Sequence, residues 1–143
     1  MEGGLALSNT RLPLIRKINC FSGYGEGWAL YSEQLADEIG MYDDDPLGRI
    51  GYLKAQLFRA NRCVVDTGLH QYRWSRERAI QYFIDAQGDT RGDAAREIDR
   101  YCANPGQACS YKIGHSTFVD IRERAKAKMG GRFDLKAFHT AVL

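Results

Sequence analysis

Residues 23–40, GYGEGWALYSEQLADEIG, decide the fold, because they join a helical pattern of apolar side chains to a glycine-rich start. At 3.6 residues per turn, one apolar stripe of this helix is formed by Trp28, Tyr31, Leu35 and Ile39. Glu26 lies between Gly25 and Gly27, and each glycine costs about 1 kcal/mol of helix propensity relative to alanine. The sequence therefore predicts a close backbone approach or a bend next to Glu26.

The position of the Glu26 carboxylate has two interpretations. A metal ligand or a catalytic acid is often held beside such a bend, and Glu33 continues the same line of the helix less than two turns later. In the other reading Glu26 is a favourable negative charge in the first helical turn, where it complements the helix dipole. The pattern leaves both open.

Composition narrows the class of protein. The chain has 143 residues, enough for one domain, and its 20 basic and 18 acidic residues are interspersed. The net charge of +2 predicts no nucleic-acid partner. The cysteines at 20, 63, 102 and 109 form no C-x-x-C pair, which favours free thiols. No apolar run approaches the roughly 20 residues of a membrane span, and no secretory pattern is present. A transmembrane segment is thus not expected, and the compartment stays open.

The spacing of apolar residues predicts helices along the chain, and no alternating strand pattern is present. We expect an all-α, irregular multi-helix bundle over residues 9–143, a helical domain fragment. Residues 1–8 are expected to be disordered or derived from cloning. Helices are predicted from Pro13, over 23–40, from Pro46 to about His70, over 75–88, from Asp93 to the Asn104–Pro105–Gly106 break, over 107–130 and from Asp134 onward.

The helix from Pro46 to His70 shows two different faces. One is an apolar stripe that predicts a core contact, made of Ile50, Leu53, Leu57, Ala60 and Val64. The other is a polar line in which Arg59, Arg62, Asp66 and His70 follow one another at helical spacing. This line is either a solvated face or the lining of a cavity, and Asp66 is placed to orient His70.

The break at Asn104–Pro105–Gly106 precedes a long helix. Free backbone N–H groups at its start, together with Gln107 and Tyr111, are expected to face a common space.

Several ordered motifs carry a family resemblance: GEGWALYSE from Gly25, RANRCVVDTGLH from Arg59, WSRERAIQY from Trp74, NPGQACSYKIG from Asn104 and FDLKAFHTAVL from Phe133. In this order they resemble the C-terminal half of the bacterial domain-of-unknown-function family number eight hundred and eighty-five. Members of that family look like zinc metallopeptidases distantly related to thimet oligopeptidase and angiotensin-converting enzyme. The resemblance implies the C-terminal portion of a larger, gluzincin-like helical fold, with a peptide-like substrate in the full-length parent.

The resemblance also implies roles for residues. Glu26 would be the later glutamate ligand of a catalytic zinc, with Asp66 and Glu33 supporting the site. Tyr111 and His70 are the candidate donors to developing negative charge, and Tyr101 is the reserve. Gly106, Gln107 and Arg62 would contact substrate.

The chain departs from the family at the metal motif. The family segment H-E-x-x-P-G-H-H has no counterpart here, because none of the histidines, His70, His115 and His139, has that spacing. We therefore expect zinc in the full-length parent, and no bound zinc and no activity in this fragment. The rival reading is a non-catalytic helical binding or assembly module. Self-association is expected through apolar faces around Trp28, Tyr31 and Phe118.

Overall fold

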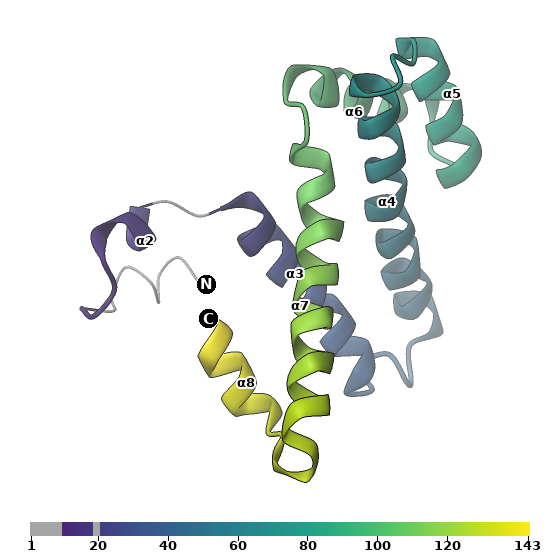
Figure 1. Cartoon of the computed structure of the whole chain (residues 1–143). Coiled ribbons are helices and arrows are strands. Elements are labelled where there is room, and N and C mark those ends of the chain that lie inside the picture. Colours follow the sequence, from purple (N-terminus) through teal and green to yellow (C-terminus); the bar gives the residue numbers. More distant parts are fainter. Residues whose placement is uncertain (1–9, 19–20) are drawn as a thin grey trace.

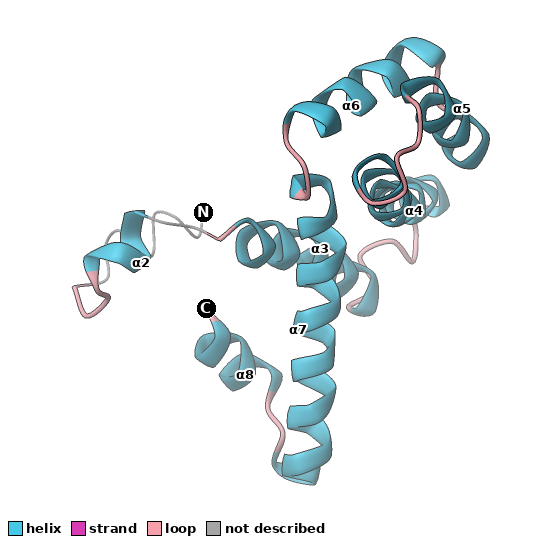
Figure 2. Cartoon of the chain, turned by 45° about the horizontal axis from the view of Figure 1, so that its top comes forward, coloured by secondary structure: helices cyan, strands magenta, loops and turns pink. Residues whose placement is uncertain are grey.

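The computed structural model describes residues 10–18 and 21–143, so the expectation for residues 1–8 lies outside the described residues. Within these ranges the regular elements are helices, with no strand (Figure 2). The predicted all-α bundle is therefore confirmed. The elements are α2 (Leu14–Ile18), α3 (Ser22–Glu38), α4 (Pro46–His70), α5 (Arg76–Gln87), α6 (Arg91–Ala103), α7 (Gln107–Met129), the 3-10 turn η1 (Gly130–Arg132) and α8 (Leu135–Val142).

Most predicted helix ends are confirmed by their caps. The side chains of Asp45, Ser75 and Asp134 each accept a hydrogen bond from the backbone N–H three residues later. The predicted start of α6 at Asp93 was wrong. Thr90 accepts the N–H of Asp93 and donates its hydroxyl to the Asp93 carboxylate, so α6 begins two residues before Asp93.

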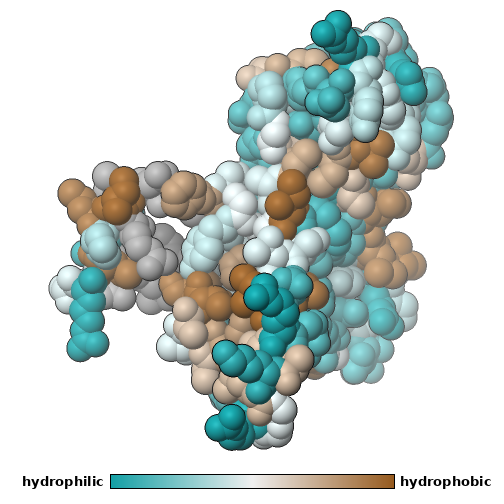
Figure 3. All heavy atoms as spheres, viewed as in Figure 1, coloured by the Kyte–Doolittle hydropathy of each residue, from teal (hydrophilic) through white to brown (hydrophobic). Residues whose placement is uncertain are grey.

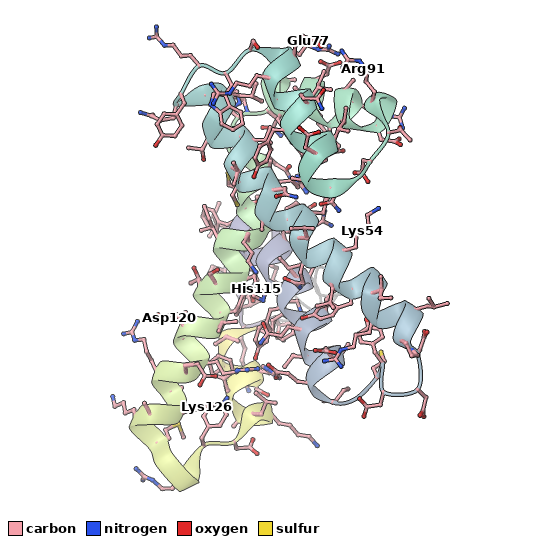
Figure 4. The ribbon with its side chains drawn as sticks, turned by 90° about the vertical axis from the view of Figure 1, so that its right-hand side faces the viewer. Lys54, Glu77, Arg91, His115, Asp120 and Lys126 are labelled. Carbon is pink, nitrogen blue, oxygen red and sulfur yellow. The ribbon has the colours of Figure 1, made fainter. Side chains whose placement is uncertain are left out.

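Helix α7 runs through the centre of the molecule, and α3 packs across it (Figure 1). A Cβ atom added to Gly27 would lie 2.5 Å from the backbone of Gly114, and one added to Gly114 would collide with the carbonyl oxygen of Gly23. The close approach predicted beside Glu26 is therefore confirmed. Two turns further along α3, His115 Nε2 lies 2.7 Å from Gln34 Oε1 (Figure 4).

The apolar core lies where the C-terminal half of α4 packs against α5, α6 and the start of α7, in the upper part of Figure 1. Its buried members are Val65, Ala79, Ile80, Phe83, Ala94, Ile98, Tyr101 and Ala108. At the surface of this core, Glu77 of α5 forms an ion pair with Arg91 of α6 (Figure 4). This core fixes the end of α4 relative to α7.

Helix α8 covers the aromatic face of α3. The Tyr31 hydroxyl lies 3.0 Å from His139 Nε2 and accepts from Arg122 Nη1 at 3.1 Å. Arg122 also makes a two-point contact with Glu38 at 2.7 and 2.8 Å, which holds the pKa of that carboxyl below its usual range. Tyr31 and Phe118 are buried, so the apolar faces expected to be bare at these residues are covered.

The predicted core stripe of α4 was wrong, because its large apolar side chains face outward (Figure 3). We call this surface the α4 apolar stripe: Leu47, Ile50, Leu53, Leu57 and Val64, each between 42% and 80% exposed. The buried side of the helix holds the middle of the polar line, with Arg62 2% and Asp66 4% exposed. These polar groups have bonding partners on α7 and on the turn that precedes it, which compensates for their loss of water.

In the described part of the chain, no helix has the length and apolar character needed to cross a membrane.

The crossing of α3 and α7 gives a direct test. We expect Gly27→Ala to lower the free energy of unfolding by about 1–3 kcal/mol or more, because the added methyl group meets backbone that cannot move aside. The matched control is Gly51→Ala on α4, where nothing lies within 4 Å of the new atom. It should be neutral or stabilising by up to about 1 kcal/mol. Urea unfolding measures both, and equal effects would contradict the close crossing.

Candidate functional site

The turn before α7 is anchored to α4 by Asp66. Gly106 has φ +83, a left-handed conformation that glycine adopts without strain. Its N–H donates to both carboxylate oxygens of Asp66, at 3.1 and 3.0 Å. The prediction that the N–H groups after Pro105 are free is therefore wrong for Gly106. This bond fixes where α7 begins, and hence where Gln107 lies.

Gln107 joins three helices through its side-chain amide. Its Oε1 accepts from Arg62 Nη2 of α4 at 3.1 Å and from Arg100 Nη1 of α6 at 3.0 Å. Guanidinium groups only donate, so the amide oxygen must face them and the NH₂ group must point the other way. There Nε2 donates to Glu26 Oε1 of α3 at 3.4 Å. The orientation of this amide is thus set by its chemistry.

Arg62 is the buried centre of the cluster. Its guanidinium carbon lies 4.4 Å from the ring centre of Tyr111 and 5.4 Å from that of Tyr101. Arg59, one turn earlier on α4, lies 4.4 Å from the same Tyr111 ring. Two cations against one ring restrict its movement. Because Gln107 and Tyr111 are four residues apart, both project from the same side of α7.

The two tyrosines differ in the state of their hydroxyl groups. Tyr101 is buried and donates to Glu97 Oε2 at 2.6 Å; burial and this bond raise the pKa of Tyr101. Glu97 also accepts from Arg100 Nη2 at 2.7 Å. The Tyr111 hydroxyl has no hydrogen bond to any residue that the structure describes. Tyr111 is therefore the tyrosine whose hydroxyl is available to a ligand.

His70 and Asp66 do not form the expected pair. The His70 ring is exposed, and its Nε2 lies 3.1 Å from the backbone carbonyl oxygen of Tyr101. Asp66 instead binds the N–H of Gly106. His70 thus binds the backbone near the end of α6. The helical spacing of the polar line is as predicted, but successive positions of the line face different neighbours.

Glu33 lies further along α3, away from Gln107. Burial raises the pKa of Glu33, and the charge of Arg59 partly opposes that rise. Its Oε2 atom is buried and has no partner within the described ranges. No group of three or more His, Cys, Asp or Glu side chains among residues 10–18 and 21–143 is placed to hold a metal ion. Glu26 and Glu33 are thus separate carboxylates rather than one chelating set.

The structure brings together six of the side chains singled out from the sequence: Glu26, Arg59, Arg62, Tyr101, Gln107 and Tyr111. Sequence analysis missed Arg100 and Glu97. Arg100 lies in the last turn of α6 and reaches Gln107 because the Asn104–Gly106 turn folds back, and Glu97, one turn earlier, accepts from Arg100. Helical periodicity does not relate residues on opposite sides of such a turn. The sequence signal that could have indicated the turn was the glycine that follows a proline at the end of the helix.

Comparison with known proteins agrees with the motifs. Residues 1–143 match the family described as "Bacterial protein of unknown function (DUF885)". No curated protein matches the chain. Among solved structures, "The crystal structure of the putative lipoprotein from Colwellia psychrerythraea" is similar, with 52% identity and a TM-score of 0.95. The match covers 99% of this chain and 24% of that one, so the chain spans about a quarter of that structure's length.

Two substitutions at Gln107 test its bridging role. Gln107→Leu removes the acceptor of two guanidiniums, one of them buried, and should lower the free energy of unfolding by about 1–3 kcal/mol. Gln107→Glu keeps acceptor oxygens for Arg62 and Arg100 and should cost less, although it loses the donor to Glu26. Chemical denaturation at neutral pH compares the two. Equal losses would show that the amide oxygen does not hold these arginines.

Proposed function

Because this chain belongs to the bacterial family of proteins of unknown function (DUF885), we propose that it supplies one wall of a hydrolytic site in a longer zinc-dependent peptidase. The supporting observation is the convergence of Glu26, Gln107, Arg62 and Tyr111 where α3, α4 and α7 meet. A carboxylate, a fixed amide, a buried cation and a free phenol can serve an amide-hydrolysing site as ligand, positioning group and donors to developing negative charge. The substrate would be a peptide or another amide.

The residues described do not by themselves fit a zinc site. A catalytic zinc takes three protein ligands of histidine or carboxylate type, whereas among residues 10–18 and 21–143 only Glu26 brings a carboxylate to hydrogen-bond with Gln107. Other ligands and the general base would have to come from the rest of a longer protein. For this chain alone we propose no bound zinc and no turnover.

Each side chain of the cluster has a distinct proposed role. Gln107 holds one oxygen of Glu26, which leaves the second oxygen available as a ligand atom. Tyr111 would donate its hydroxyl to negative charge that develops on the substrate, and its ring is held in place by two guanidiniums. Tyr101 is a poorer candidate for this role because Glu97 occupies its hydroxyl.

Two substitutions in a longer family member that carries these residues separate the roles. Glu26→Gln should remove zinc and hydrolysis together, because an amide oxygen is a much poorer ligand than a carboxylate. Tyr111→Phe should keep zinc but lower turnover by about 10²–10³-fold, the usual effect of losing one donor to a developing charge. The measurement is metal content and peptide hydrolysis on the same preparations, with His70→Ala as control.

Two outcomes would contradict these assignments. If Glu26→Gln keeps full zinc, the carboxylate is not a ligand and Glu33 is the next candidate. If Tyr111→Phe hydrolyses peptide at the parent rate, its hydroxyl has no part in the reaction. His70→Ala should stay close to the parent rate, because the ring binds a backbone carbonyl away from Gln107.

The α4 apolar stripe favours a second candidate function, a helical binding or assembly module. Five large apolar side chains follow one line of a helix over 18 positions, which is about 27 Å at 1.5 Å per residue. Such a contiguous surface is typical of a face that another element covers. In this reading the fragment self-associates through α4 and the Glu26 cluster is structural.

Sedimentation of the chain at micromolar concentration tests the assembly reading. If α4 mediates self-association, the wild-type chain sediments as a dimer or larger species. Leu53→Lys should then return it to a monomer without loss of stability, because Leu53 is 55% exposed. Ile113→Lys on α7, also exposed at 61%, is the matched control and should leave assembly intact. A wild-type chain that stays monomeric contradicts this reading.

A further inference from the structure

Arg59 stands out among the cations of the cluster because nothing described in the chain accepts its hydrogen bonds. Its guanidinium carbon lies 4.4 Å from the ring centre of Tyr111 and 5.1 Å from that of Phe58. The residue is half-buried, and its Nε atom is buried without a partner in the described ranges. An arginine has five N–H donors. Leaving the buried Nε–H of Arg59 without an acceptor costs free energy unless a ligand or water accepts it.

The acidic side chains nearby do not neutralise Arg59 by contact. Glu33 feels its charge, yet burial raises the pKa of Glu33 and no ion pair joins the two. Glu26 faces the amide of Gln107, and Asp66 is bound to a backbone N–H. The guanidinium of Arg59 therefore stays charged, and its N–H donors remain available to a ligand.

Arg62 adds a second cation beside the first. It is 2% exposed, its Nη2 is bound to Gln107, and its Nε has no partner among the residues described. Arg59 and Arg62 lie at equal distances from the centre of the Tyr111 ring, so two positive charges lie against the tyrosine whose hydroxyl has no partner among the described residues. An anionic group would be attracted to this place, and Arg59 is the cation with donors and access to meet it.

We propose that Arg59 binds a carboxylate of the ligand: the free C-terminus of a peptide or an acidic side chain. A guanidinium and a carboxylate match as two parallel hydrogen bonds, and the stacked Tyr111 ring holds the guanidinium flat for that contact. This inference deepens the proposed peptidase function, since it names the group by which a substrate is recognised. Only the statement that this carboxylate belongs to a substrate rests on the proposed function, because the binding itself needs neither zinc nor turnover.

The test is a titration of the ¹⁵N-labelled chain, followed through the arginine Nε–H signals by NMR. The probes are N-acetyl-Ala-Ala with a free C-terminus, its C-terminal amide, and N-acetyl-Glu-amide. We expect the Arg59 signal to shift in a saturable way with the first or third probe and not with the second. A response to the first alone identifies a C-terminal carboxylate, and a response to the third alone identifies an acidic side chain.

Two variants make the result specific. Arg59→Gln, followed through the backbone amide signals that shift in the wild type, should weaken binding by about 10-fold or more, the effect expected when a hydrogen bond between charged groups is lost. Arg78→Gln is the matched control, because Arg78 is an exposed arginine whose guanidinium carbon also lies 4.4 Å from an aromatic ring, that of Trp74. It should bind as the wild type does. If Arg59→Gln does not fold, Arg59→Lys serves instead, since it keeps the charge and loses the fork.

Several results would overturn the proposal. These are no saturable shift with any probe, an equal response to the amide, unchanged binding in the Arg59 variant, or an equal response to inorganic sulfate. Failure of the peptidase proposal would look different. A longer family member would then lack zinc or hydrolysis while carboxylate binding at Arg59 persisted.

Discussion

The backbone contact between Gly27 and Gly114 is the constraint on which the candidate site depends. The packing of α3 against α7 leaves no room for a Cβ atom at Gly27 or at Gly114, because each would collide with the backbone of the other helix. Glu26 precedes that crossing by one residue, and Gln107 lies about two turns before Gly114 on α7. The close approach therefore brings the carboxylate within reach of the amide, and a wider spacing would separate them.

The second requirement is a buried polar face on α4. Arg62 and Asp66 are almost fully buried, which is costly unless each has partners. Their partners are the side chain of Gln107 and the N–H of Gly106, the first residues at the start of α7. The same bonds that compensate for burial thus position α7 relative to α4. Stability and site geometry depend on one set of contacts, so a substitution at the site will also affect the fold.

The sequence was sufficient for the class of fold, for most helix ends and for the grouping of Glu26 with Gln107 and Tyr111. It failed on which face of α4 is buried. That helix has two continuous stripes, one apolar and one polar, and periodicity identifies both without saying which neighbour each one meets. The exposed line at Leu53 and Leu57 shows that apolar character alone does not decide burial. Asp66 and His70 were paired wrongly for a related reason, since their partners come from distant segments. Arg100 was missed because it reaches Gln107 across a turn.

The central claim is that these helices hold Glu26 as one ligand of a metal completed by other parts of a longer protein. The most direct measurement is a crystal structure of a longer family member grown with zinc, with anomalous data at the zinc edge. Our account predicts a zinc peak about 2.0–2.2 Å from the Glu26 oxygen that Gln107 leaves free, with Tyr111 facing the same space. A fully occupied zinc held by residues that do not include Glu26 would contradict it.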